Sequence, residues 1–208
     1  MPKGGGGDCG KSEERRGRLE ARDGRGTAGR GGFRGHRPRC AAAVPVSLVA
    51  ALAFGVTANL AGRPGGVEDR RWYEEQRQAS FAPPGWVFGP AWAINNASVL
   101  WGNLRLLNLP EDTPHRRQLL WLQGVSWALF SSFGYVYFEK RSPILAFVWT
   151  ASFYALTIVS AALSWRVDRK IALSFVTLLL WLTLATPVAA YQVVHNPDEY
   201  FRTPAWRR

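Results

Sequence analysis

The sequence predicts an all-α integral membrane protein, a bundle of five transmembrane helices. Beyond residue 41 the chain contains several apolar runs of about 20 residues, long enough to cross a bilayer core of roughly 30 Å. The segments between these runs are short, and short connections place consecutive helices side by side and antiparallel. The chain has no alternating strand pattern, heptad run or long-period repeat that would favour another fold.

Composition divides the 208 residues into three parts. Residues 1–40 are rich in Gly and Arg with almost no large apolar side chains, which predicts a disordered basic tail. Residues 41–196 form the predicted transmembrane domain, and residues 197–208 form a polar C-terminal tail. The formal net charge is +11, and residues 1–41 hold eleven Lys and Arg against five Asp and Glu. This polar head explains why the mean hydropathy is only −0.11.

The basic head allows other interpretations. A transit peptide is disfavoured, because such peptides are poor in the acidic residues that this head contains. Arg and Gly repeats can contact nucleic acid or anionic lipid, but we expect a solvated tail beside the membrane and no nucleic-acid partner. Cys9 and Cys40 imply no disulfide framework. Cys40 stands just before an apolar segment, where palmitoylation is the alternative to a free thiol.

The first helix is expected over about 41–62. Small residues recur there every four positions and suit close helix packing: Ala43, Ser47, Ala51 and Gly55. A signal peptide is the alternative, since basic residues precede the run, but the run exceeds a typical apolar signal region. A polar loop over 63–82 follows.

The second helix is expected over about 84–107. Pro83 and Pro84 suit its start, because proline lacks a backbone donor and the first donors of a helix have no partner within it. Gly85 and Gly89 form a small-xxx-small pair that would let a neighbouring helix approach closely.

Three further helices complete the prediction. The third is expected over about 117–138, after a loop that contains prolines and before a basic pair. The fourth is expected over about 143–165, opened by Pro143, and the fifth over about 171–195, kinked at Pro187.

The chain contains ten tryptophans. Five lie near segment ends, at the headgroup level that Trp prefers: Trp72, Trp86, Trp121, Trp165 and Trp206. The other five fall inside apolar runs and need packing or ligand partners: Trp92, Trp101, Trp127, Trp149 and Trp181.

Polar residues inside membrane helices are energetically expensive and point to function. The adjacent amides of Asn95 and Asn96 are expected to face a cavity. Asp168 is expected to pair with a basic neighbour in its own loop, Arg166 or Lys170.

The sequence contains no catalytic constellation. Its three histidines lie in the head or at segment ends, and no metal-ligand spacing is present. We therefore expect no metal site, no required cofactor and no enzyme of the acid–base type.

One stretch resembles a known family. Arg71-Trp72-Tyr73, a short polar run, and then Pro-Pro-Gly-Trp-Val-Phe-Gly-Pro-Ala-Trp over 83–92 are similar to the tryptophan-rich sensory protein / translocator protein family. This is the TspO/MBR or peripheral benzodiazepine receptor family. The resemblance covers about residues 42–196 and is strongest over 71–92. It implies a five-helix membrane bundle with an apolar pocket near the first loop, used by tetrapyrroles, sterols and drug-like ligands.

Position by position, the resemblance implies pocket residues on three helices: Phe88, Gly89, Ala91, Trp92, Leu145, Val148, Ala185 and Val188. Trp92 would stack on the ligand, and the 63–82 loop would act as a lid. The fifth helix matches the family through Trp181 and Ala185. Four positions depart from the family pattern: Asn96 replaces a Tyr, Phe130 and Phe133 replace an Asn and a Trp, and Ala189 replaces an Asn.

The function implied is binding, with transport or sensing, of a planar hydrophobic ligand such as a porphyrin-type or haem-type tetrapyrrole, or a sterol-like molecule. The lipid bilayer is the expected environment, and a homodimer is expected from the small-residue stripes. Two alternatives stay open. One is a porphyrin-degrading photo-oxidative enzyme with Trp92 as its redox-active residue. The other is a regulatory or scaffold protein without a small-molecule ligand, whose basic tail engages a partner.

Overall fold

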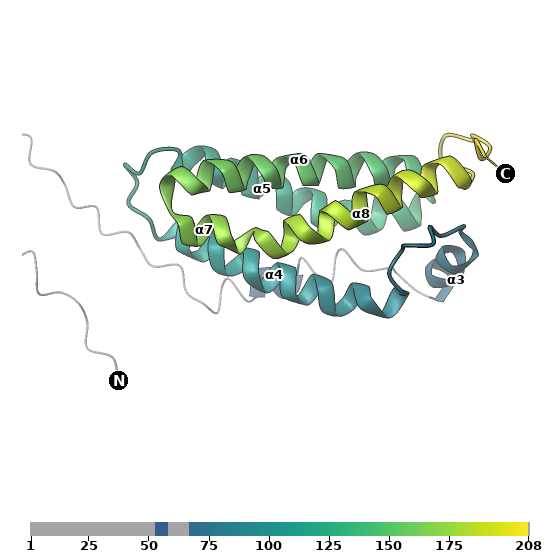
Figure 1. Ribbon diagram of the computed structural model, residues 1–208, viewed down its shortest axis with the longest axis horizontal. Coiled ribbons are helices and arrows are strands. Elements are labelled where there is room, and N and C mark those ends of the chain that lie inside the picture. The colour runs from purple at the N-terminus through teal and green to yellow at the C-terminus, as the bar shows by residue number, and fades with distance from the viewer. Residues whose placement is uncertain (1–52, 58–66, 208) are drawn as a thin grey trace, which may run out of the picture. The chain divides into compact units, whose positions relative to one another are not determined.

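The computed structural model describes residues 53–57 and 67–207 (Figure 1). Its named elements are α3 (Val67–Glu75), α4 (Gly85–Leu107), α5 (Arg116–Gly134), the π-helix η1 (Tyr135–Glu139), α6 (Pro143–Val167), α7 (Arg169–Ser174) and α8 (Val176–His195). The only strand-like pairing in the described ranges is an isolated bridge between Asp198 and Thr203. The prediction of an all-α chain is confirmed for these residues.

Four of the five expected helices fall within the described part of the chain. They are α4, then α5 continued by η1, then α6, then α7 followed by α8. The first expected helix, 41–62, lies outside the described residues except for 53–57, which are helical. The number of five therefore stays a prediction. The segment 63–82, expected as a loop, contains α3, so that expectation is wrong in this respect.

Two of the described helices are long and apolar enough to cross a membrane: α6, and the nearly continuous pair of α7 and α8. The other two long helices carry polar side chains that lower their hydropathy but face the protein interior. The buried ones are Asn95, Asn96, Asn103, Gln123 and Ser126. Polar groups placed inside a bundle avoid contact with lipid, where they would be costly.

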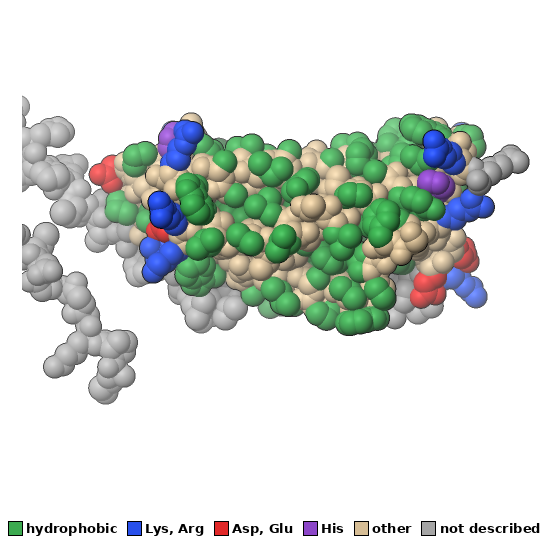
Figure 2. All heavy atoms as spheres, viewed as in Figure 1, with side chains coloured by type: hydrophobic (Ala, Val, Ile, Leu, Met, Phe, Trp, Pro, Cys, Tyr) green, Lys and Arg blue, Asp and Glu red, His purple; other side chains and the backbone are tan. Residues whose placement is uncertain are grey.

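The outer surface of the described helices separates charged from apolar side chains. Figure 2 shows the Lys, Arg, Asp, Glu and His side chains of this face gathered at the two ends of the helices, with hydrophobic side chains between them. Four of the five tryptophans expected near segment ends are more than half exposed: Trp86, Trp121, Trp165 and Trp206. The fifth, Trp72, is buried and packs against Tyr137.

The helices pack around two clusters of buried side chains. Figure 1 shows α5, α6 and α8 running along one another, and α6 makes its most extensive contacts with α8 and α5. One cluster centres on Leu106, Leu119 and Leu182. The second consists of Trp72, Tyr137 and Ala146 at the end where α3 lies.

An ion pair joins α4 to the start of α7. Arg105 lies 2.7 Å from the Asp168 carboxylate, which also accepts a hydrogen bond from the Lys170 backbone N–H at 2.8 Å and so caps α7. The Arg105 guanidinium holds the pKa of Asp168 below its usual range. The expected pairing with the side chain of Arg166 or Lys170 is wrong, because the partner comes from a helix 63 residues earlier.

The residues after α8 fold back onto the end of the bundle. Asp198 is only 2% exposed. Its carboxylate accepts hydrogen bonds from the Ser142 hydroxyl at 2.6 Å and from the backbone N–H groups of Ile144 and Phe201 at 3.0 and 2.8 Å. Ser142 also caps α6 by accepting from Leu145 N–H at 3.1 Å. The C-terminal segment is therefore fastened to the start of α6.

Candidate functional site

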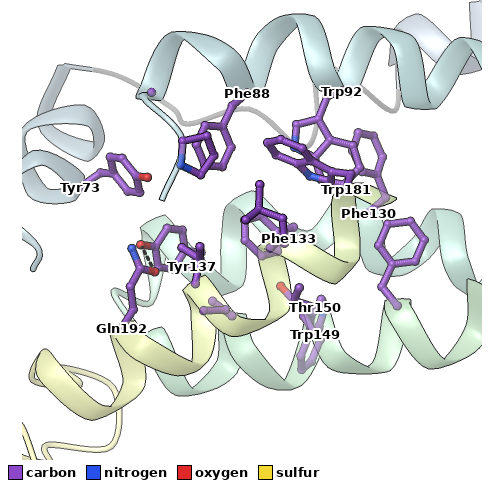
Figure 3. Close-up of a pocket in the computed structure, with 18 of the residues that line it drawn as sticks. Tyr73, Phe88, Trp92, Phe130, Phe133, Tyr137, Trp149, Thr150, Trp181 and Gln192 are labelled. Atoms are coloured by element: carbon purple, nitrogen blue, oxygen red, sulfur yellow. Dashed lines mark hydrogen bonds between the residues drawn. The ribbon is translucent and has the colours of Figure 1, made fainter. Parts of the chain in front are cut away.

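A cavity of about 800 Å³ lies among α3, α4, α5, η1, α6 and α8 (Figure 3). Its volume is within the range of sites for small molecules, roughly 300–1,000 Å³. Phe130 of the first buried cluster and Tyr137 and Ala146 of the second all line it. The cavity therefore occupies the region where the two clusters meet.

The α4 wall is built from one stripe of the helix. Gly85, Phe88, Gly89 and Trp92 line the cavity at spacings of three and four residues, which place them on one face. A Cβ atom at Gly85 or Gly89 would meet nothing within 4 Å. These glycines therefore do not pack tightly on a described neighbour, contrary to the expectation of close helix approach; they leave room beside the aromatic rings.

Aromatic contacts hold the α4 rings in place. The Trp92 ring lies 4.9 Å from Phe130 and 6.2 Å from Trp181, measured between centroids. Phe88 meets Trp181 edge to face at 5.2 Å. Such pairs favour fixed orientations and contribute about 0.5–1.5 kcal/mol each. These contacts therefore pre-organise the aromatic wall.

The opposite wall is also aromatic. Figure 3 shows Phe133 and Tyr137 across the cavity from Phe88 and Trp92. On α6, Trp149 lines the cavity while its indole N–H donates to the Ser132 hydroxyl at 2.9 Å. Because this bond satisfies the polar atom of the indole, the ring presents an apolar surface.

Two polar side chains stand at one end of the cavity. The Tyr137 hydroxyl donates to Oε1 of Gln192 at 2.8 Å, a bond drawn in Figure 3. Nε2 of Gln192 donates to Oε1 of Gln78 at 2.9 Å. The cavity wall is thereby joined to the segment that follows α3.

The segment from α3 to residue 82 is bonded to the end of α8 and the residues after it. The Asn196 side chain accepts from Arg77 N–H at 2.7 Å and donates to Arg77 O at 3.1 Å. The Trp72 indole N–H donates to Glu199 at 3.2 Å. Tyr73 lines the cavity between Phe88 and Tyr137, and burial raises its pKa, so its phenol stays neutral. The segment expected as a lid thus lies against the cavity.

The structure brings five of the eight predicted site residues together on the cavity wall: Phe88, Gly89, Trp92, Ala185 and Val188. It does not bring Ala91, Leu145 and Val148 there. The reason is helical rotation. Neighbouring residues differ in direction by about 100°, and the α6 stripe is Ala146, Trp149, Thr150 and Phe153. Leu145 and Val148 precede this stripe by one residue, and Val148 is 46% exposed.

Sequence reasoning did not include several lining residues among the predicted sites: Tyr73, Phe130, Phe133, Tyr137, Trp149, Trp181, Ala189 and Gln192. Phe130, Phe133 and Ala189 depart from the family pattern, and this departure is a sequence signal that points to the cavity wall. Of the two amides expected to face a cavity, Asn95 lines none of the described cavities, and Asn96 borders only a separate space of about 10 Å³ together with Gln123 and Ser126.

The described residues contain no group of three or more His, Cys, Asp and Glu side chains that could hold a metal ion. The chemistry of the large cavity is instead that of an apolar, aromatic enclosure with one polar end. Such enclosures bind hydrophobic small molecules by expelling water from both surfaces.

Comparison with known proteins agrees with this architecture. No curated protein matches the chain significantly. The sequence profile of the TspO/MBR family matches residues 40–194, which is more than half of the chain. Members of this family are integral membrane proteins, with roles in ligand binding, transport or sensing. The chain therefore belongs to the TspO/MBR family and is an integral membrane protein.

Proposed function

We propose that this protein binds a flat, apolar small molecule, such as a porphyrin-type tetrapyrrole, in the large cavity, and that binding serves transport or sensing. The observation that carries the proposal is the cavity of about 800 Å³ walled by aromatic rings from both sides. A flat apolar ligand would gain from the burial of its faces and from contact with oriented rings. A sterol-like molecule is the other ligand that this apolar enclosure would suit.

Trp92 is the residue we assign to stacking on the ligand. It is partly buried and sits among Phe130, Phe153 and Trp181, with its ring within 5° of parallel to that of Phe153. The α3 segment would serve as the lid, because Tyr73 reaches the cavity from α3. Ligand exchange would require the bonds between this segment and the end of α8 to open.

Fluorescence titration of the full chain in lipid nanodiscs tests the proposal. Protoporphyrin IX is added and quenching of Trp emission is followed. We expect saturable quenching, and we expect Trp92→Phe to weaken the affinity by about two- to tenfold, the value of one aromatic contact. Trp121→Phe is the matched control, because Trp121 is 69% exposed and lies outside the cavity wall.

Two outcomes would contradict the proposal. Linear quenching would mean partition into the bilayer without a site. Equal affinities of Trp92→Phe, Trp121→Phe and the unaltered protein would mean that the porphyrin binds elsewhere. The homodimer expected from the sequence is a separate part of the proposal. The molecular mass of the detergent-solubilised protein tests it, and we expect the mass of two chains.

A further inference from the structure

The two polar side chains at one end of the cavity restrict what a ligand can place there. Tyr137 and Gln192 are 4% and 5% exposed, so water does not compete freely for them. Tyr137 gives its one hydroxyl hydrogen to Gln192, so its oxygen has only lone pairs left to offer. The Oε1 atom of Gln192 also keeps a second lone pair. The Tyr137 oxygen and Gln192 Oε1 are therefore hydrogen-bond acceptors at this end of the cavity, beside the second Nε2 hydrogen of Gln192, which is a donor.

The charged groups of the cavity wall also disfavour an anionic ligand. Among the described residues that line the cavity, the one charged side chain is the carboxylate of Glu74 on α3, and none is Lys, Arg or His. An ionised carboxylate placed in an apolar enclosure without a cationic partner loses hydration that nothing replaces. The lone pairs of the Tyr137 oxygen and of Gln192 Oε1 would also repel such a carboxylate.

We propose that the cavity selects an uncharged flat molecule whose hydroxyl or N–H group donates to Tyr137 and Gln192, and that it disfavours an ionised carboxylate at this end. The inference rests on the binding function proposed above and narrows its ligand class. For a porphyrin, it means that a ring with esterified or absent carboxyl groups binds more tightly than the free diacid.

Three pyrene probes of the same flat shape test this selection: pyrene, 1-hydroxypyrene and pyrene-1-carboxylate. Each is titrated at neutral pH into the full chain in nanodiscs, and affinities are corrected for partition into protein-free nanodiscs. We expect 1-hydroxypyrene to bind about two- to tenfold more tightly than pyrene, the value of one net hydrogen bond. We expect pyrene-1-carboxylate to bind most weakly. Protoporphyrin IX dimethyl ester should likewise bind more tightly than protoporphyrin IX.

A pair of matched variants locates the polar contact. Tyr137→Phe removes one of the two acceptors, so the ratio of the affinities for 1-hydroxypyrene and pyrene should fall. Tyr135→Phe is the same change two residues away in η1, at a side chain that is 55% exposed and outside the wall, and should keep the ratio. Using a ratio cancels general effects of a variant on the cavity.

The outcomes separate this inference from the proposed function. Tightest binding by the carboxylate, or by the porphyrin diacid over its ester, would overturn the inference and leave the binding function standing. A ratio of the affinities for 1-hydroxypyrene and pyrene that is unchanged in Tyr137→Phe would also overturn it. Saturable binding by none of the probes would refute the binding function itself. The ligand series on the unaltered protein decides the charge preference even if Tyr137→Phe fails to fold.

Discussion

Replacing Gly102 by alanine would test a close approach of α4 to α7. A Cβ atom at Gly102 would lie 2.8 Å from the Cβ of Ser174, closer than packed side chains tolerate. Ser174 is held in place, because its hydroxyl donates to Ile171 O at 2.7 Å and its carbonyl accepts from the Ser98 hydroxyl at 2.8 Å. We expect the added methyl group to push the two helices apart, and α4 carries one wall of the cavity.

The magnitude follows from two opposing terms. Overpacking a tight site costs about 1–3 kcal/mol, whereas Gly→Ala in a helix stabilises by about 0.5–1 kcal/mol. Gly102→Ala should therefore destabilise the fold by up to about 2.5 kcal/mol. At Gly124 on α5 a Cβ would meet nothing within 4 Å, so Gly124→Ala is the matched control and should be neutral or stabilising.

Thermal unfolding of the full chain in detergent, followed by Trp fluorescence, measures the difference. For a chain of this size, 1 kcal/mol corresponds to about 2–4 °C in Tm. The double variant Gly102→Ala/Ser174→Gly removes the Cβ atom that the new methyl group meets, so it should melt above Gly102→Ala. The reasoning is refuted if Gly102→Ala melts together with Gly124→Ala, or if the double variant recovers nothing.

Three further predictions concern the polar contacts at the two ends of the bundle. Because the folded-state pKa of Asp168 lies below its ordinary value of 3.8, its contact with Arg105 stabilises fully above about pH 4 and is lost as the pH falls through that lowered pKa. Asp168→Asn should therefore flatten the acid side of the Tm–pH curve, and an unchanged slope would contradict this. Asn196→Ala removes both bonds to Arg77 and should speed hydrogen exchange at 76–82 while α6 is unaffected; equal exchange at 76–82 would count against a fastened lid. Asp198→Ala leaves three donors unpaired and should cost about 2–3 kcal/mol in chemical unfolding, with a loss below 1 kcal/mol as the contrary result.

The starts of α4 and α6 are the features of the fold that the sequence predicts best. The expected helix 84–107 is α4, Gly85–Leu107, and the expected helix 143–165 is α6, Pro143–Val167. α4 begins directly after Pro84, and α6 begins at Pro143. Proline fixes the backbone and lacks a donor, so a single residue marks each helix start. The break at Phe175 between α7 and α8 has no such marker, since neither proline nor glycine stands there.

The cavity was predictable only where its residues follow a motif. Phe88, Gly89 and Trp92 belong to one short stretch of α4, and the structure places all three on the wall. The α6 residues were assigned one position too early, because an apolar helix lacks the polar face that would reveal its rotation. The hydrogen bond between Tyr137 and Gln192 joins residues that are 55 positions apart in the chain, and no local sequence pattern predicts such a bond.

The contacts that hold the α3 segment against the cavity also impose an order on its assembly. The segment after α3 is synthesised early, yet its partners lie 114 and 119 residues later in the chain, and the partner of Trp72 lies 127 residues later. During synthesis α4, α5 and α6 emerge long before those partners. The α3 segment therefore cannot be fastened against the cavity until residues 192–199 have been synthesised. Until then, lipid or a hydrophobic molecule can reach the cavity from the side that the α3 segment later covers.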